Sequence, residues 1–199
     1  MIWNELSPVA TGDLPLAAFR EHLRLGTGFA DDGVQDGLLE TILRSAIAAI
    51  ERRSGKILLE RDFRLVVEAW GQRERQALPV APVTAITSVS LRDAAGVSSP
   101  VPVIQFRLIE DAHRPVVAGV SGNLPTIPMG GSAEVVFTAG LGAGWVDVPP
   151  DLAQACFLLA AHYHENRHAS GDQQRNLPQG VEALVEPWRV IRTFGSYRG

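Results

Sequence analysis

Residues 36–53 read DGLLETILRSAIAAIERR, and this stretch predicts the clearest helix of the chain. Its apolar residues recur every three or four positions and form one broad stripe, which is typical of a helix that buries one face. The stripe consists of Leu38, Leu39, Ile42, Leu43, Ala46, Ile47 and Ile50. Arg52 and Arg53 suit the negative end of the helix dipole, and Gly55 is a suitable ending residue.

Immediately after this helix the hydrophobic pattern changes from helical to strand-like. In residues 57–70, Phe63, Leu65 and Val67 alternate with polar neighbours, as expected of a half-buried strand. Further strands are predicted at 83–92, 101–109 and 134–139, separated by turn-forming clusters such as 93–96 and 129–132. Because short turns connect them, these strands should form an antiparallel sheet. We expect this sheet as an insertion at about residues 57–140.

Helical patterns flank the predicted insertion on both sides. Residues 14–25 place Leu16, Phe19 and Leu23 at helical spacing, and residues 152–161 are apolar almost all round, which is typical of a buried central helix. This last helix should begin near Pro149-Pro150-Asp151 and continue to about His168. The predicted fold is α+β: a small α-helical bundle with an inserted antiparallel β-sheet, forming a domain over 1–176, and an extended C-terminal tail over 177–199.

Composition limits the classes of function. The chain has 199 residues, 46% of them hydrophobic, which suits one domain with a real core. Its net charge of −4 gives no general attraction to nucleic acid or to anionic membranes. The single cysteine, Cys156, cannot form an internal disulfide and lies in an apolar run, where a buried structural thiol is expected. No signal peptide and no apolar run of membrane-spanning length (about 18 residues) is found. We expect folding in a reducing cytoplasm.

One motif suggests an enzyme. His164-Glu165-Asn166-Arg167-His168 spells HExxH, in which two histidines on one helix face could bind Zn²⁺ while Glu165 activates a water molecule. Gly171 extends the match, but Gln174 stands where the long form of the motif has its third ligand, and an amide is a poor zinc ligand. We therefore assign no catalytic and no metal-binding residue, and keep a zinc metalloprotease as the alternative.

The C-terminal tail has a distinct composition. After a short helical turn at 181–185, aromatic residues alternate with arginines, and no acid follows Glu186. A frayed terminus is the ordinary interpretation, but such termini are usually small and polar, whereas Trp and Arg anchor interfaces. The composition therefore favours a docking role for the C-terminal tail over a frayed end.

Taken in order, these segments resemble one family, the head-to-tail connector (adaptor) proteins of tailed bacteriophages and phage-like particles. The resemblance covers most of the chain and rests on the following stretches: Leu14-Pro15-Leu16 with Glu21-His22-Leu23-Arg24; residues 36–54 with Ile50-Glu51-Arg52; Leu78-Pro79-Val80-Ala81-Pro82-Val83; Val135 to Gly140; and Val148-Pro149-Pro150 to Arg167. Of the 18 basic residues only Lys56 is a lysine, and this arginine bias is similar to that of gene transfer agent and prophage versions.

The resemblance implies a structural protein without a cofactor, located at the head-to-tail junction (neck) of a virion assembled in the bacterial cytoplasm. Its implied partners are the portal protein, a tail-side connector or stopper protein, and further copies of itself in a ring, expected to be a dodecamer, through which DNA passes without specific binding. In the family the C-terminal segment docks on the portal. Transferred to this chain, that role falls on Leu184, Val185, Pro187, Trp188, Arg189, Phe194, Tyr197 and Arg198. The role of the loop at 141–148 stays open, and a DNA-binding module is a third hypothesis.

Overall fold

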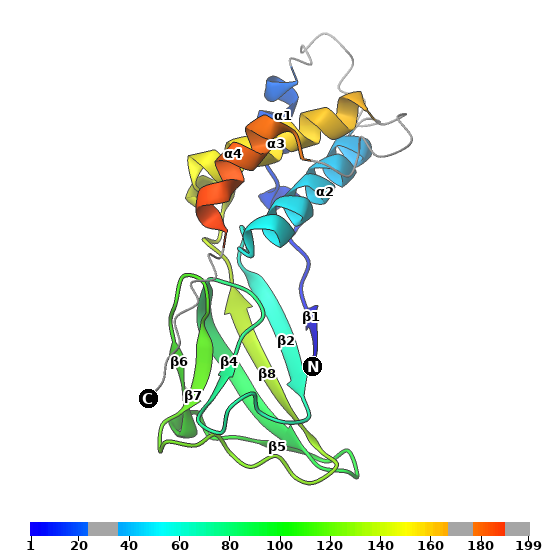
Figure 1. Cartoon of the computed structure of the whole chain (residues 1–199). Coiled ribbons are helices and arrows are strands. Elements are labelled where there is room, and N and C mark those ends of the chain that lie inside the picture. Colours follow the sequence, from blue (N-terminus) through cyan, green and yellow to red (C-terminus); the bar gives the residue numbers. More distant parts are fainter. Residues whose placement is uncertain (24–35, 167–176, 190–199) are drawn as a thin grey trace. The chain divides into compact units, whose positions relative to one another are not determined.

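The structure is a computed structural model, and it describes residues 1–23, 36–166 and 177–189 (Figure 1). The chain divides into two compact units. The first, here called the β unit, comprises residues 1–18 and 56–149; the second, the helical unit, comprises residues 19–55 and 150–199. Each unit is described by itself below.

The β unit contains two antiparallel sheets. The larger has the strand order β1-β2-β8-β4-β5, formed by β1 (Ile2–Glu5), β2 (Arg61–Val67), β8 (Ser132–Ala139), β4 (Val83–Arg92) and β5 (Ser98–Pro100). The smaller has the order β3-β7-β6, formed by β3 (Arg75–Ala77), β7 (Val116–Gly119) and β6 (Phe106–Ile109). Three short 3₁₀ helices complete the unit: η1 (Thr11–Asp13), η2 (Val103–Gln105) and η3 (Trp145–Asp147).

The core of the β unit follows from the alternation of side chains along its strands. In β8, every second residue is completely buried, namely Ala133, Val135, Phe137 and Ala139. Phe137 stacks on Phe63 of β2, with ring centroids 5.8 Å apart. Because successive strand residues point to opposite faces, the same strand leaves Glu134, Val136 and Thr138 on the outer face. One face of the larger sheet therefore forms part of the hydrophobic core of the β unit.

Lys56, the only lysine, is buried where the β unit resumes after the long helix. Its Nζ donates to the Ala112 carbonyl oxygen and lies 2.9 Å from His113 Nδ1. Burial lowers the pKa of Lys56, and the nearby Asp111 carboxylate opposes that shift. The Asp111 carboxylate accepts hydrogen bonds from the backbone N–H groups of His113 and Arg114. These two hydrogen bonds hold the pKa of the Asp111 carboxyl below its usual range. The lysine therefore fixes the turn between β6 and β7.

The helical unit is built from α1 (Leu16–His22) from Phe19 onward, α2 (Asp36–Ser54), α3 (Pro150–Glu165), α4 (Gln179–Val185) and the 3₁₀ helix η5 (Glu186–Trp188). The helix α3 packs against both α2 and α4. Phe19 is buried and stacks on Phe157 of α3, with ring centroids 6.0 Å apart, and Arg20 forms an ion pair with Asp36 at the start of α2. None of the described helices is both long enough and apolar enough to cross a bilayer.

The predicted α+β class is confirmed, as are the helix at 36–53 and the strand at 83–92. The single predicted sheet is wrong, because the strands form two sheets. Residues 101–109 were predicted as one strand, but 103–105 form η2 and only 106–109 pair with β7. The chain turns there because Gln105 N–H donates back to the Pro102 carbonyl oxygen. The helix predicted to reach His168 ends at Glu165, where the Asn166 side chain donates to the His162 carbonyl oxygen.

The predicted boundary at residue 177 differs from the structural division. The first part of the predicted tail is α4, which packs on α3 and belongs to the helical unit. Residues 190–199 lie outside the described residues. The extended tail beyond Arg189 stays a prediction.

Substitution of Leu159 by alanine tests the position of α3 in the helical core. Leu159 is completely buried, so Leu159→Ala should lower the free energy of unfolding by about 2–5 kcal/mol through lost burial and the remaining cavity. Chemical denaturation measures this difference. Gln154→Ala on the exposed side of the same helix is the control and should change stability by less than about 0.5 kcal/mol. Equal stability of the two variants would contradict the central position of α3.

Candidate functional site

The described part of the predicted docking region is residues 179–189, here called the C-terminal segment. Pro178 precedes α4 with an extended backbone, and Pro187 lies in the first turn of η5, where its missing N–H costs no helical hydrogen bond. Val181 and Val185 are four residues apart, face the same side of α4 and are buried. Glu182, on the exposed side, pairs with Arg53 of α2 at 3.0 Å. These contacts attach the segment to the helical unit.

Trp188 is held by a specific polar contact. Its indole Nε1 donates to Asp151 Oδ2 at 2.6 Å, and Asp151 Oδ1 accepts the backbone N–H of Leu152 at 2.9 Å. The Asp151 carboxylate therefore accepts hydrogen bonds from a backbone N–H in the first turn of α3 and from the indole N–H. The Trp188 ring is half-buried, so part of its surface faces outward. Arg189 pairs with Glu186 at 2.9 Å and is also half-buried.

The structure brings five of the predicted docking residues together in one short segment. They are Leu184, Val185, Pro187, Trp188 and Arg189. Val185 points into the core of its own unit and is 1% exposed, so it positions the segment and offers no surface to a partner. Leu184 is half-buried and Pro187 is exposed. Phe194, Tyr197 and Arg198 lie outside the described residues.

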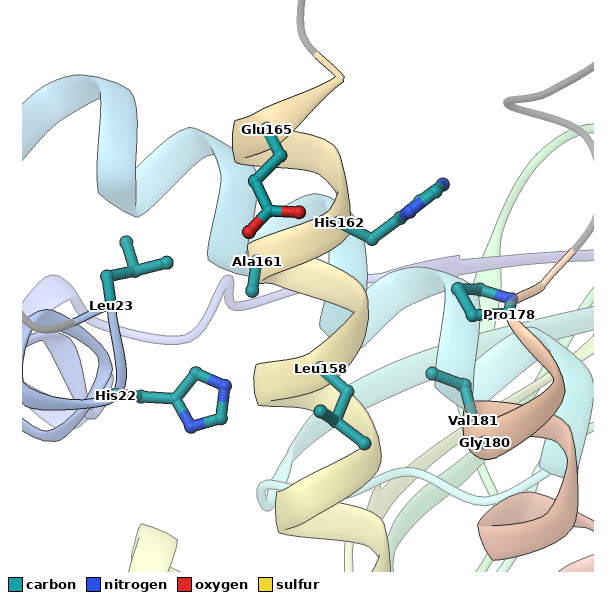
Figure 2. Close-up of a pocket in the computed structure, with 9 residues that line it drawn as sticks. All are labelled: His22, Leu23, Leu158, Ala161, His162, Glu165, Pro178, Gly180 and Val181. Atoms are coloured by element: carbon teal, nitrogen blue, oxygen red, sulfur yellow. The ribbon is translucent and has the colours of Figure 1, made fainter.

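A groove runs beside this segment, here called the α1–α3–α4 groove (Figure 2). It has a volume of about 530 Å³ and is lined by His22, Leu23, Leu158, Ala161, His162, Glu165, Pro178, Gly180 and Val181. The floor is α3, and the two walls are the end of α1 and the start of α4 (Figure 2). The His22 ring packs on Phe157, with centroids 5.6 Å apart. Sequence analysis missed this groove, because no local pattern reports that the ends of separate helices converge.

Sequence comparison finds no matching family model and no matching curated protein. Comparison of structures gives close matches. A chain from the neck of an empty gene transfer agent (GTA) particle, computed with C6 symmetry, is 50% identical with a TM-score of 0.88, and 98% of each chain is covered. A chain from the virion of a native GTA particle is 50% identical, with a TM-score of 0.85. A chain from the neck of a native GTA particle, computed with C12 symmetry, is 46% identical, with a TM-score of 0.83. In both comparisons 98% of each chain is covered.

The chain belongs to the GTA neck proteins. Identity of this level over almost the whole of both chains confirms the resemblance to head-to-tail connectors and locates the protein in the virion neck.

The HExxH string receives no support as a zinc site in this neck protein. His164 is half-buried near the end of α3, Glu165 is exposed, and His168 lies outside the described residues. The described residues hold no cluster of three His, Cys, Asp or Glu side chains that could bind a metal ion. The Cys156 thiol is buried in α3, and burial, with Glu51 nearby, raises its pKa, which keeps it protonated and unreactive.

Zinc analysis of the purified neck protein tests the protease alternative directly. Because Gln174 replaces the third ligand, we expect well below one zinc per chain after dialysis against buffer without chelator. His164→Ala should leave the zinc content unchanged. About one equivalent of zinc, lost in His164→Ala and accompanied by peptide cleavage, would establish the metalloprotease alternative.

Replacement of the indole donor tests how the C-terminal segment is held. Trp188→Phe keeps an aromatic ring but removes the N–H that bonds to Asp151, so the free energy of unfolding should fall by about 1–2 kcal/mol. In an Asp151→Ala background the same substitution should cost little more, since its partner is already gone. Full additivity of the two substitutions would show that the contact does not stabilise the unit.

Proposed function

We propose that this neck protein is a structural adaptor that forms a ring between the portal of a GTA head and the tail, and that it docks on the portal through its C-terminal segment and the residues that follow it. The observation that carries the proposal is the match of 50% identity over 98% of both chains to a chain in a GTA neck computed with C6 symmetry. A further match comes from a neck computed with C12 symmetry. Rotational symmetry of this kind supports several equivalent copies, and a dodecamer is the simplest assembly that satisfies both.

The geometry of the C-terminal segment supports a docking role. Trp188 is fixed by Asp151 and yet keeps part of its ring at the surface, next to the exposed Pro187. An aromatic side chain that is already ordered loses little rotamer freedom on binding, which favours affinity. Trp and Arg are also the residues most often found at the energetic centres of interfaces. A ring repeats such a contact in every copy, so a modest affinity per copy becomes a stable joint.

The remaining partners follow from the same proposal. A tail-side connector or stopper protein binds the opposite end of the ring, and DNA passes through the lumen without specific binding. The net charge of −4 is compatible with such passage, since it provides no general attraction for phosphate. In this proposal the protein has no catalytic activity.

Truncation separates the two parts of the proposed docking region. A chain ending at Arg189 lacks residues 190–199 and keeps every described contact. A chain ending at Glu186 lacks residues 187–199 and therefore loses Trp188 and its hydrogen bond to Asp151. Both should fold, because Val185 is the last buried residue in the described part of the chain. The longer chain should join portal-bearing heads poorly if Phe194, Tyr197 and Arg198 contribute, and the shorter chain should fail to join. Electron microscopy of heads incubated with each variant counts the occupied necks.

Point substitutions at Trp188 provide the matched control. Trp188→Ala should weaken joining by about thirtyfold per contact, which corresponds to the roughly 2 kcal/mol that a central aromatic contributes. Trp188→Phe keeps most of the ring surface and should join better than Trp188→Ala. Normal yields of gene-transferring particles from both truncated chains would show that the portal contact lies elsewhere.

A further inference from the structure

The two sheets of the β unit end in four strand edges, and these edges differ in whether their backbone groups are available. In an antiparallel pair, residues alternate between bonding to the partner strand and facing away from it. An edge strand therefore presents the N–H and C=O of every second residue to the outside, where another strand could pair with them. The four edges are β1 and β5 in the larger sheet and β3 and β6 in the smaller.

Two of these edges are closed by their own sequence. In β5, Val101 N–H donates to the Val89 carbonyl, which makes Pro100 an outward-facing residue, and proline has no N–H to offer. In β3, the outward-facing residues are Arg75 and Ala77. Arg75 exchanges both backbone hydrogen bonds with Gln72, and the Ala77 carbonyl accepts from the Gln76 side chain. A further strand at β3 would have to displace these contacts, and at β5 it would find no N–H on Pro100.

The edge at β1 is open except at the Glu5 carbonyl oxygen, which accepts a hydrogen bond from Asn4 Nδ2 at 3.2 Å. Leu6 N–H donates to the Asp62 carbonyl, so Ile2, Asn4 and Leu6 bond to β2. Trp3 and Glu5 consequently direct their backbone groups outward. The strand is exposed along its whole length, with Ile2 70% and Trp3 44% exposed. An edge that carries large apolar side chains and no proline or lysine is the kind that native proteins normally protect.

The edge at β6 also has outward backbone groups without a backbone partner among the described residues, although part of β6 lies close to β4 of the larger sheet. Val120 N–H donates to the Gln105 carbonyl, and Gly119 N–H donates across to Glu74, so Arg107 and Ile109 bond to β7. Phe106 and Leu108 then direct their backbone groups outward. Exposed apolar side chains also lie here, with Ile104 78% and Ile109 39% exposed. Within the described residues, no backbone hydrogen bond reaches the outward groups of Trp3, Phe106 or Leu108.

We propose that β1 of one copy pairs in antiparallel fashion with β6 of the next copy, so that the sheets of neighbouring subunits join around the ring. This inference rests on the ring of the proposed function and names the surface that closes it. A cyclic ring needs two different surfaces on each subunit, one for each neighbour. Within the β unit, β1 and β6 lie on opposite sides (Figure 1), as such a head-to-tail contact requires.

The pattern of the two strands selects the register. Each strand has four residues and two outward residues separated by one position, Trp3 and Glu5 on β1 and Leu108 and Phe106 on β6. Full overlap of the antiparallel strands makes these the hydrogen-bonded pairs. It also sets Ile2 opposite Ile109 and Trp3 opposite Leu108, apolar against apolar. This register leaves one pair of a charged and an apolar residue, Glu5 opposite Phe106, whereas a parallel arrangement would give two, Trp3 beside Arg107 and Glu5 beside Ile109.

Cysteine cross-linking in assembled particles tests both the surface and the register. In the proposed register Asn4 and Arg107 form a non-hydrogen-bonded pair, whose Cα atoms should be about 4.5 Å apart, within disulfide range. Both side chains are exposed, and the native Cys156 is buried, so it does not compete. Particles carrying Asn4→Cys with Arg107→Cys should give, after mild oxidation, a non-reducing gel ladder of dimers, trimers and larger multimers.

The matched control combines Asn4→Cys with Ser98→Cys, since Ser98 is exposed on the closed β5 edge. It should stay monomeric. Monomers alone from both double variants, in particles that contain the protein at normal amounts, would overturn the strand pairing and leave the neck role intact. Absence of the wild-type chain from the ring at the neck would instead overturn the proposed function.

A proline substitution supplies a second measurement, which decides the matter if the cysteine variants do not assemble. Glu5→Pro removes an outward N–H without removing a β1–β2 hydrogen bond, whereas Glu5→Ala removes the same side chain, including its 3.0 Å ion pair with Arg61, and keeps the N–H. Both lose the ion pair to Arg61, whose side chain is only 10% exposed, so both should lower the thermal stability of the β unit to the same extent. Incorporation into particles should drop at least tenfold for Glu5→Pro relative to Glu5→Ala. Equal incorporation of the two variants would overturn the proposed pairing.

Discussion

The fold of the β unit depends on one strand that is hydrogen-bonded on both of its sides. The strand β8 lies between β2 and β4, and its four inward side chains are completely buried. Gly140 follows it with φ of +157°, and a Cβ there would lie 2.4 Å from the Glu60 backbone, so only glycine allows the chain to leave the sheet at this point. Because β8 is central, the two flanking pairs of strands are fixed relative to it. The outer strands differ in whether their outward backbone groups are available for pairing with another strand. That difference underlies the proposed contact between subunits.

Sequence periodicity predicted the elements that bury a regular face. The stripe of α2 and the alternation of β8 each follow from a single buried side, and both elements lie where the pattern indicates. The strands that escaped prediction are β1, β3, β5 and β7. They are three or four residues long, and β1 and β5 are exposed on every residue, so they carry no hydrophobic alternation. Their existence is determined by pairing with distant strands, which sequence periodicity does not report.

In the candidate site, too, the local sequence predicted a segment, whereas contacts between residues far apart in the chain could not be predicted. The composition of the C-terminal region led to the prediction that Trp188 is an anchor, because large aromatic and arginine residues are uncommon in frayed ends. Its partner Asp151 was predicted only as a residue for the start of α3, and the contact across 37 positions became visible only in three dimensions. Val185 illustrates the opposite case, since the family resemblance implied a docking role for it, whereas its side chain is buried in the core of the helical unit. The sequence therefore predicted a docking segment, and packing shows which of its described side chains remain exposed.

The burial of Lys56 has a consequence for how the assembled neck responds to its surroundings. Every other basic side chain, apart from the five histidines, is an arginine, whose guanidinium stays protonated at any pH that a folded protein survives. The arginine charge is thus constant from neutral to strongly alkaline solution, and alkaline titration cannot weaken an arginine-mediated joint. Since the single lysine amine is enclosed by Ala112 and His113, reagents that acylate lysines would also find none accessible on the folded chain. The positive charge that this chain contributes to the neck through its arginines is in this sense permanent.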